Sequence, residues 1–359
     1  MRRASKLAAV AVVASMAMTG CGKNNDTTSG SKSTSQADIC KTAKGTKGPK
    51  VGLAYDVGGR GDQSFNDSAY AGVSKAVKAF DGSCVEGEAQ DGEAESARED
   101  RLRQMADAGA KAIIGVGFAY SDAVNAVAPD YKDTSFAVVD GFDPDSKPNP
   151  NVAYLTFAAN ESSYLVGAAA ALTSKTNQVG FVGGVHNDLI KAFEAGYTAG
   201  AKAAKPGIKV DIAYIQESNL SGFSDPSGGK TAAAGEFDKG ADVVYHAAGA
   251  SGSGIFDAAV EAGKGKWAIG VDSDQYLTAT KQQQPHILTS ALKRVDVASY
   301  DFISSVDKGS PVTGYATYDL KNNGVGYATS GGFLDSIKSK LDGYATKIKS
   351  GDIKVPTAP

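Results

Sequence analysis

Histidine, tryptophan and cysteine are all rare in this chain of 359 residues, which contains three, one and three of them respectively. The three histidines, His186, His246 and His286, lie far apart and show no spacing typical of metal ligands. The chain also lacks a block of basic residues that could neutralise a row of phosphates, and its formal net charge is −3. These absences argue against a histidine-ligated metal site and against nucleic-acid binding.

Most motifs of enzyme active sites are also missing. None of the glycine-rich loops has the Gly-Lys-Ser/Thr ending of a Walker A motif. The run KAIIGVGFAY has Tyr120 where a dinucleotide-binding fingerprint needs its third glycine, and GASGSG lacks the serine spacing of a nucleophile elbow. The acidic stretch from Asp140 to Asp145 lacks the pattern of a calcium-binding loop. We therefore predict a protein without a cofactor or a metal, and not an enzyme.

The N-terminal residues are typical of a targeting signal. Three basic residues precede an apolar stretch, residues 7–18, which is too short to span a bilayer and ends at Met-Thr-Gly before Cys21. This order resembles a bacterial lipoprotein signal, which implies that residues 1–20 are removed and that Cys21 is lipidated. The alternative is an ordinary secretory peptide with a chance cysteine.

Residues 21–48 are predicted to be a flexible tether, because the segment is rich in Ser, Thr, Asn and Gly and contains few apolar residues. A lipid followed by a tether would hold the body at the extracytoplasmic face of the cell membrane. Removal of residues 1–20 takes away three positive charges and leaves a net charge of −6. In such an oxidising compartment Cys40 and Cys84 form either a disulfide or two separate thiols.

From residue 50 onwards, short apolar runs alternate with longer helical patterns. The runs are apolar at successive positions, which is typical of parallel strands covered by helices on both faces. The alternation occurs in two series, and about 310 residues exceed one comfortable core. We therefore predict an α/β protein with two doubly wound parallel-sheet lobes. The expected N-terminal lobe is 49–157 plus about 287–312, and the expected C-terminal lobe is 158–286 plus about 313–355.

Aspartates follow three of the predicted central strands, at Asp56, Asp140 and Asp272. Ligands of open parallel sheets bind outside the carboxyl ends of the strands, so this set indicates a binding site. Each aspartate taken alone is better explained as a helix cap or a turn residue. Asp272 and Asp274 also form a candidate general acid and base pair.

Phenylalanines occur next to these strand ends. Phe65 opens a helix in the otherwise polar sequence SFND, which favours a position in the cleft between the lobes. Phe193 lies in the first turns of a later helix, and Phe118 follows the apolar run ending in GVG. For Phe193, packing in the core is an equally good interpretation.

The chain as a whole resembles the basic membrane protein family, also described as purine nucleoside receptor lipoproteins, the substrate-binding components of ABC transporters. The resemblance runs from about residue 50 to 350 and rests on these motifs in order: AYDVGGRGDQSFND, FAVVDG, IKAFEAGYTAG, YHAAGASGSGIFDAA, AIGVDSDQ and LTSALKRVD. It implies a type I periplasmic-binding fold, in which three hinge crossings join two lobes that close on a ligand. It also implies a monomer that passes an adenosine-, guanosine- or inosine-type nucleoside to an ABC permease.

The resemblance also implies a role for each matching residue. Phe65 and Phe193 would sandwich the purine, and Asn66 and Asp140 would hydrogen-bond the base. The ribose hydroxyls would be held by four groups: Asp56, the backbone of Gly249, Asp272 and Lys293. Two alternatives remain open: binding of a sugar or another small polar ligand, and an extracytoplasmic nucleoside hydrolase.

Overall fold

The structure is a computed structural model that describes residues 38–359, apart from residues 145 and 148. The predicted signal peptide (residues 1–20), the predicted lipidation site Cys21 and most of the predicted tether therefore lie outside the described residues. Within the described range, no helix combines the length and the apolar character that a membrane span requires.

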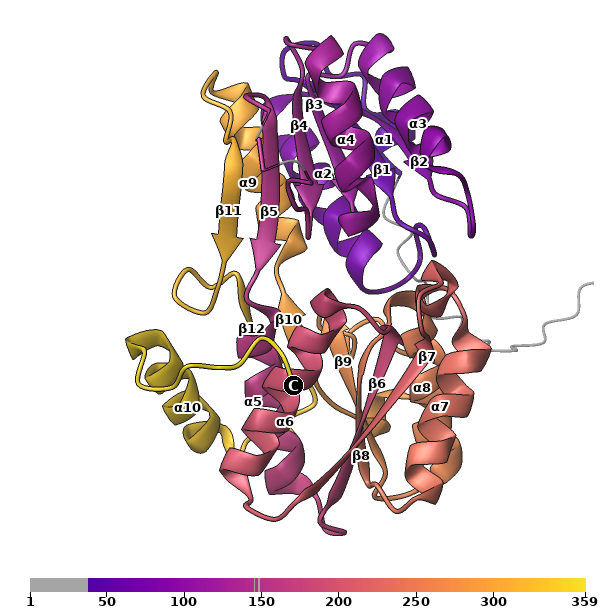
Figure 1. The fold of residues 1–359 in the computed structure, drawn as a ribbon, viewed down its shortest axis with the longest axis vertical. Coiled ribbons are helices and arrows are strands. Elements are labelled where there is room, and N and C mark those ends of the chain that lie inside the picture. The colour runs from indigo at the N-terminus through magenta and orange to yellow at the C-terminus, as the bar shows by residue number, and fades with distance from the viewer. Residues whose placement is uncertain (1–37, 145, 148) are drawn as a thin grey trace, which may run out of the picture. The chain divides into compact units, whose positions relative to one another are not determined.

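The first sheet contains six strands, all parallel. They are β1 (Lys50–Tyr55), β2 (Ser83–Glu88), β3 (Ala112–Val116), β4 (Ser135–Val139), β5 (Val152–Phe157) and β11 (Gly314–Tyr318). Their order across the sheet is β11-β5-β4-β3-β1-β2 (Figure 1). The helices packed on this sheet are α2 (Phe65–Phe80), α3 (Glu95–Asp107), α4 (Ser121–Val127) and α9 (Val295–Asp307).

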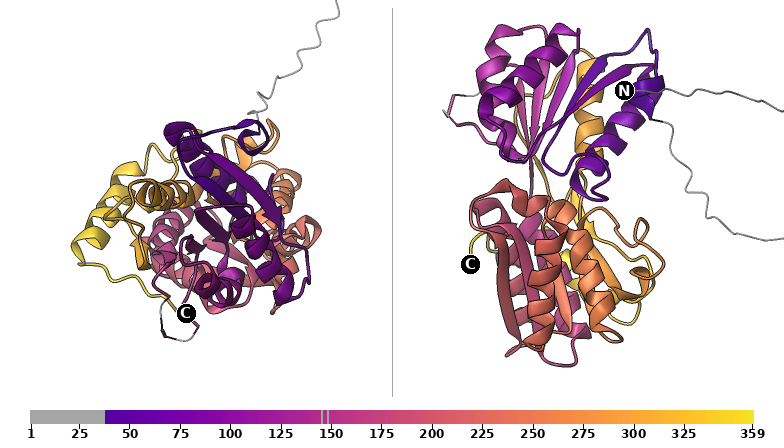
Figure 2. Two further views of the ribbon diagram at one scale, coloured as in Figure 1. Left: turned by 90° about the horizontal axis from the view of Figure 1, so that it is seen from above. Right: turned by 90° about the vertical axis from the view of Figure 1, so that its right-hand side faces the viewer.

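Helices cover both faces of this sheet (Figure 2). Leu53 of β1 packs in a cluster with residues of α2 and α9, whereas its neighbour Ala54 packs in a second cluster with residues of α3 and α4. Successive side chains of a strand point to opposite faces, so both must be apolar here. This arrangement explains why the strands read as continuous apolar runs.

The second sheet also contains six strands. They are β6 (Gln178–Val185), β7 (Lys209–Gln216), β8 (Val243–Ala247), β9 (Trp267–Asp272), β10 (Ile287–Lys293) and β12 (Val325–Tyr327). Their order is β12-β10-β9-β8-β6-β7, and only β12 runs antiparallel to its neighbour. The helices around this sheet are α5 (Ala159–Thr173), α6 (Asp188–Ala204), α7 (Pro226–Asp238), α8 (Gly252–Ala262) and α10 (Lys338–Ser350). The two sheets with their helices are called the first and second lobes below.

The structure confirms the predicted fold class but corrects the assignment of the tail. Residues 287–293 were expected in the first lobe, yet they form β10 and pair with β9 in the second sheet. Residues 314–318 were expected in the second lobe, yet they form β11 and pair with β5 in the first sheet. An apolar run identifies a strand but does not say which sheet edge it joins, and this explains the error.

The predicted tether also ends earlier than expected. Residues Ile39–Thr42 form a short helix, α1, and Cys40 is joined to Cys84 of β2 by a disulfide with a Cα–Cα distance of 4.7 Å. The backbone N–H of Ile39 donates a hydrogen bond of 2.9 Å to the Tyr70 hydroxyl. The segment from residue 38 is therefore attached to the first lobe.

Among the described residues, one group of acidic, histidine or cysteine side chains is compact enough to hold a metal ion, and it consists of Asp38, Cys40 and Glu86. The sulfur of Cys40 is bonded to Cys84 in the disulfide.

Candidate ligand-binding site

One cavity lies at the carboxyl ends of the strands and is lined by residues of both lobes. Its empty volume is about 540 Å³, part of which is open to solvent. All eight residues named from the sequence line it: Asp56, Phe65, Asn66, Asp140, Phe193, Gly249, Asp272 and Lys293. Asp274, the other half of the candidate acid–base pair, does not line this cavity and accepts a hydrogen bond of 2.6 Å from Ser330.

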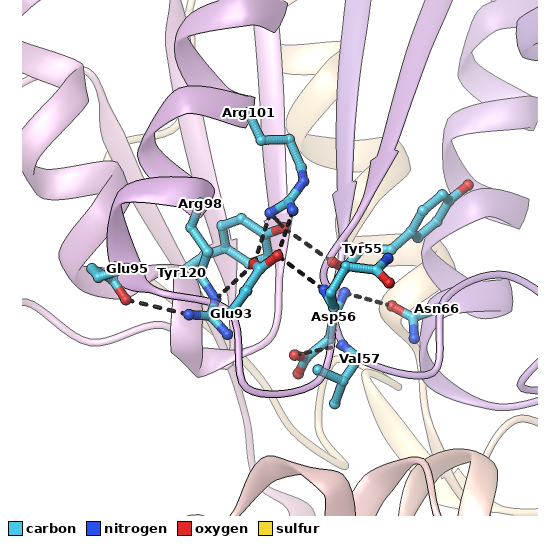
Figure 3. Close-up of polar contacts among 10 residues, drawn as sticks. Tyr55, Asp56, Val57, Asn66, Glu93, Glu95, Arg98, Arg101 and Tyr120 are labelled. Carbon is cyan, nitrogen blue, oxygen red and sulfur yellow. Dashed lines mark hydrogen bonds and ion pairs between the residues drawn. The ribbon is translucent and has the colours of Figure 1, made fainter.

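Asp56 follows β1 and is 6% exposed. Its Oδ1 accepts a hydrogen bond of 2.9 Å from the N–H of Val57, and its own N–H donates to Asn66 Oδ1 at 3.0 Å (Figure 3). Gly117 lies against the carboxylate with φ of +98°, and a Cβ atom there would be 2.2 Å from Asp56 Oδ2. Burial raises the pKa of Asp56 to about 7. Near neutral pH, this carboxyl group can thus change its charge.

The first turn of α2 is held by Asp62, a cavity residue that was not singled out from the sequence. Its carboxylate accepts hydrogen bonds from the backbone N–H groups of Ser64, Asn66 and Asp67 at 2.9, 2.8 and 3.1 Å. These are unpaired donors at a helix start, so Asp62 caps α2 and sets the direction of the Phe65 and Asn66 side chains. Burial raises the pKa of Asp62 to about 6. A capping aspartate two residues before Ser64 was the signal available in the sequence.

Asp140 and Lys293 form a buried ion pair across the cavity. Asp140 follows β4 with φ of +58°, and Lys293 ends β10. The Lys293 ammonium also lies 4.5 Å from the ring centroid of Phe65 and 5.7 Å from that of Phe193, distances typical of cation–π contacts. The resemblance placed these two charged groups at different parts of the ligand, Asp140 at the base and Lys293 at the ribose, and their direct contact was not expected.

Asp272, at the end of β9, contacts the start of α2 directly. Its Oδ2 accepts a hydrogen bond of 2.6 Å from the Ser64 hydroxyl, and the Ser273 hydroxyl donates to the carbonyl of Ser64 at 3.1 Å. Burial raises the pKa of the Asp272 carboxyl. Residues of the second lobe thereby fix the turn that carries Phe65.

The aromatic lining comes from four phenylalanines. Phe193 is 3% exposed and belongs to the core of the second lobe, while its ring also lines the cavity, so both sequence interpretations of this residue describe it. Phe65 is half-buried against the core of the first lobe. Phe118, mentioned from the sequence, and Phe223, which was missed, complete the set. Phe223 lies in the turn after β7, where no repeated pattern marks a binding residue.

Position 249 requires glycine because of its backbone conformation. It begins the 3₁₀ turn Gly249–Ser251 after β8 with φ of +53°. A Cβ atom at this position would lie 3.1 Å from the carbonyl oxygen of Phe223. Glycine therefore lets the backbone approach the cavity at this point.

The cavity lining is acidic. Among the described residues, four carboxyl groups (Asp56, Asp62, Asp140 and Asp272) face it with one ammonium group, Lys293, which is already paired with Asp140. Such a set of acceptors favours an uncharged ligand with several hydrogen-bond donors and disfavours a phosphate. The phenylalanines add surfaces for a flat ring.

Known proteins resemble this chain over most of its length. Residues 49–358 match the family model Bmp, described as ABC transporter substrate-binding protein PnrA-like. The chain is 35% identical to the "CD4+ T-cell-stimulating antigen" of Listeria monocytogenes, over 88% of this chain and 90% of that protein. It is 33% identical to the "ABC transporter nucleoside-binding protein BmpA" of Lactococcus lactis, over 99% of both chains.

Solved structures show the same fold. A solute-binding protein of an ABC transporter system from Aeropyrum pernix superposes with a TM-score of 0.74 at 27% identity, covering 86% of this chain and 94% of that one. The family match spans almost the whole described chain and includes every strand and every cavity residue. The chain therefore belongs to the Bmp family of PnrA-like ABC transporter substrate-binding proteins.

Proposed function

We propose that this protein captures a purine nucleoside between its two lobes and delivers it to an ABC permease, without catalysis. The observation that carries the proposal is the cavity in which Phe65 and Phe193 flank a buried charge pair while carboxylates approach from neighbouring strand ends. A purine offers a flat ring for the phenylalanines, and ribose offers hydroxyl donors for the carboxylates. The name of the Lactococcus lactis relative supports this choice.

Each of the eight cavity residues named from the sequence has a proposed role. Phe65 and Phe193 enclose the base, and Asn66 and Asp140 hydrogen-bond its edge. Asp56, the Gly249 backbone and Asp272 accept or donate at the ribose hydroxyls. Lys293 donates to a ribose oxygen and keeps its contact with Asp140, because charge-assisted hydrogen bonds of this kind are strong in a buried site.

The charge of the cavity supports a nucleoside over a nucleotide. A 5′-phosphate would bring up to two negative charges close to carboxyl groups that have no free cation beside them in the described cavity. A free sugar satisfies the carboxylates equally well but leaves part of the aromatic surface uncovered. The experiment must therefore distinguish binding of a nucleoside from binding of a sugar.

Calorimetric titration of the purified protein with adenosine, guanosine, inosine, adenosine monophosphate, ribose and glucose tests this proposal. We expect at least one nucleoside to bind at least a hundredfold more tightly than either sugar and than the nucleotide. Tight binding of a sugar alone would contradict the proposal. Recovery of the free base and ribose after incubation would show a hydrolase instead.

We further propose that the protein is a monomer held at the outer face of the cell membrane by a lipid on Cys21. The order of the N-terminal signal supports this. Mass spectrometry of the native protein should find residues 1–20 removed and an acylated N-terminal cysteine, and Cys21→Ser should release the protein from membranes. An unmodified Cys21 would contradict the anchor but leave the nucleoside proposal intact.

A further inference from the structure

Ser64 immediately precedes α2, at the position where the side chain of a serine usually caps a helix. The Ser64 hydroxyl does not cap α2, because the Asp62 carboxylate accepts the N–H groups of Asn66 and Asp67 instead. Ser64 is 0% exposed and does not line the ligand cavity. A fully buried hydroxyl that the helix does not use as its cap needs another explanation.

The Ser64 hydroxyl points to the second lobe. It donates a hydrogen bond of 2.6 Å to Oδ2 of Asp272, and the carbonyl oxygen of Val271 lies 3.3 Å from it. In return, the Ser273 hydroxyl donates to the carbonyl oxygen of Ser64 at 3.1 Å. Ser64 belongs to the first lobe, whereas its three partners lie at the end of β9 and directly after it. These contacts therefore join the two lobes beside the ligand cavity.

The contact with Ser64 uses only one oxygen of the Asp272 carboxylate. Among the described residues, none donates a hydrogen bond to Oδ1 of Asp272. Asp272 is 6% exposed and lines the ligand cavity. A hydrogen bond from a hydroxyl to a carboxylate is short and strong, so the bond to Oδ2 fixes the rotation of the carboxyl group. Oδ1 is left as an acceptor for a ligand.

The backbone of Asp272 adds a second constraint. Its φ is +62°, in the left-handed region, and the N–H of Ser273 donates to the carbonyl oxygen of Val271 at 2.7 Å. Residues other than glycine seldom adopt this conformation, and such strained positions are frequent at binding sites. The backbone thus sets the direction in which the Asp272 side chain leaves the strand, and Ser64 sets the orientation of its two oxygens.

Asp272 also borders a second cavity, whose lining includes Gln63, Asp67, Ser273, Asp274 and Arg294. Asp272 is the only described residue that lines both this cavity and the ligand cavity. The second cavity is partly open to solvent and contains the guanidinium group of Arg294, and both attract a carboxylate. Without the bond from Ser64, the carboxyl group would therefore be free to turn away from the ligand.

We propose that Ser64 is a positioning residue of the ligand site, which holds the Asp272 carboxylate across the two lobes so that its second oxygen accepts a hydrogen bond from a ribose hydroxyl. The proposal rests on the nucleoside-binding function proposed above. Ser64 does not touch the ligand and acts through Asp272. Its contribution to affinity should therefore depend on the hydroxyl that Asp272 binds.

Calorimetric titrations of wild type and Ser64→Ala test the inference. The ligands are whichever of adenosine, guanosine and inosine the wild type binds, and the 2′-deoxy and 3′-deoxy forms of that nucleoside. Ser64→Ala should bind the ribonucleoside at least about tenfold more weakly, because a misplaced Asp272 loses a hydrogen bond to a charged group. The deoxy form without the hydroxyl that Asp272 binds should have the same, weaker affinity for wild type and Ser64→Ala.

Ser68→Ala is the matched control. Ser68 is a buried serine on the same helix, its hydroxyl accepts a hydrogen bond of 3.1 Å from the N–H of Asp296 in the same lobe, and it does not line the ligand cavity. This variant should bind all three ligands like the wild type. In an Asp272→Ala background, Ser64→Ala should change the affinity less than about twofold, because the two residues act as one unit.

The outcomes separate the two proposals. If wild type binds a nucleoside and Ser64→Ala binds it equally well, the role of Ser64 is wrong and the nucleoside function stands. A loss that is equal for the ribonucleoside and both deoxy forms, or that persists in the Asp272→Ala background, would show a merely structural serine and overturn the inference. The same holds if wild type binds both deoxy forms as tightly as the ribonucleoside.

Two further results are also decisive. If wild type binds no nucleoside, the proposed function is wrong and this inference falls with it. Should Ser64→Ala fail to fold, Ser64→Gly also removes the hydroxyl, and glycine is well tolerated before a helix. The expected and the contradicting results for Ser64→Gly are those given for Ser64→Ala.

Discussion

The ammonium group of Lys293, at the end of β10, forms an ion pair with the carboxylate of Asp140, which follows β4. Both side chains are nearly inaccessible, at 3% and 4% exposure. Because β10 belongs to the second sheet and β4 to the first, the pair joins the two lobes at the ligand cavity. The position of Lys293 near the rings of Phe65 and Phe193 makes the charge pair and the aromatic pair one unit.

Lys293→Met should leave Asp140 as a buried charge without its cation. We expect the free energy of unfolding to fall by about 3 kcal/mol, as for other broken buried pairs, and nucleoside affinity to fall at least tenfold. The double variant Lys293→Met with Asp140→Asn should regain most of the stability but not the affinity. Denaturant unfolding and calorimetry measure the two effects. A double variant as unstable as the single one would show that the lost stability does not come from leaving the Asp140 charge without its cation.

Phe65→Ala and Phe193→Ala should each weaken nucleoside binding by about 1–3 kcal/mol, the usual value for one base stacked on an aromatic side chain. Phe193→Ala should also reduce stability, since this residue belongs to the core of the second lobe, whereas Phe65→Ala should do so less. Phe333→Ala is the control, because Phe333 is partly exposed and does not line the cavity. Unchanged affinity in both cavity variants would mean that the base lies elsewhere.

Asp91→Ala should speed release of the nucleoside. Both oxygens of Asp91, in the loop after β2, accept hydrogen bonds from the Ser224 hydroxyl of the second lobe at 2.8 and 2.9 Å, and neither residue lines the cavity. Loss of such a bond costs about 1 kcal/mol, which corresponds to a dissociation rate about fivefold higher with little change in the association rate. Stopped-flow measurements of the dissociation rate test this. The control is Asp133→Ala, a substitution of an exposed residue. Equal rates in Asp91→Ala and wild type would contradict a role for this contact in holding the lobes together.

The double substitution Cys40→Ser and Cys84→Ser should lower the free energy of unfolding by about 2–4 kcal/mol, as for other disulfides that close loops of this size. It should also loosen the loop after β1. Arg60 of that loop lies 3.5 Å from the Tyr70 ring centroid and pairs with Asp38 and Glu86, which flank the disulfide. Thermal denaturation and hydrogen exchange of residues 57–63 measure the two effects. Unchanged hydrogen exchange in this loop would show that the disulfide stabilises the fold as a whole but does not hold the loop in place.

Asp56→Asn should make the protein more stable at neutral pH while it weakens binding. The Asp56 carboxyl has a pKa of about 7 in the folded protein, against an ordinary value of 3.8, so its ionisation opposes folding progressively from about pH 4 to 7. The stability advantage of the variant should therefore be absent near pH 3.5, grow across that range and reach on the order of 2–4 kcal/mol above pH 7. Urea unfolding at several pH values checks this. An advantage that does not vary with pH would indicate that Asp56 is ionised without penalty.

Much of the fold could be predicted from the sequence because both faces of each central strand are buried. Leu53 and Ala54 pack on opposite sides, so apolar runs alternating with helices identify a doubly wound sheet. The aspartates were recognisable because ligands of such sheets bind at the carboxyl ends of the strands. All eight residues suggested for the site line one cavity, although their roles in binding remain proposals.

The remaining features depend on contacts between distant parts of the chain. The run that forms β10 could join either sheet, and only its pairing with β9 assigns it to the second. The contact of Lys293 with Asp140 spans 153 positions and leaves no local pattern. Arg98 lies in the strongly polar sequence ESAREDRLRQMAD, which suggests a solvated helix, so its burial could not be anticipated. Asp62 could have been recognised as a helix-capping residue, but nothing distinguished it from the other polar residues of the same loop.

A crystal structure of the protein with adenosine, guanosine or inosine bound tests the central claim most directly. The account predicts the purine between the rings of Phe65 and Phe193, with ribose hydroxyls within hydrogen-bond distance of Asp56 and Asp272. A nucleoside bound outside this cavity, or one that contacts neither phenylalanine ring, would contradict it.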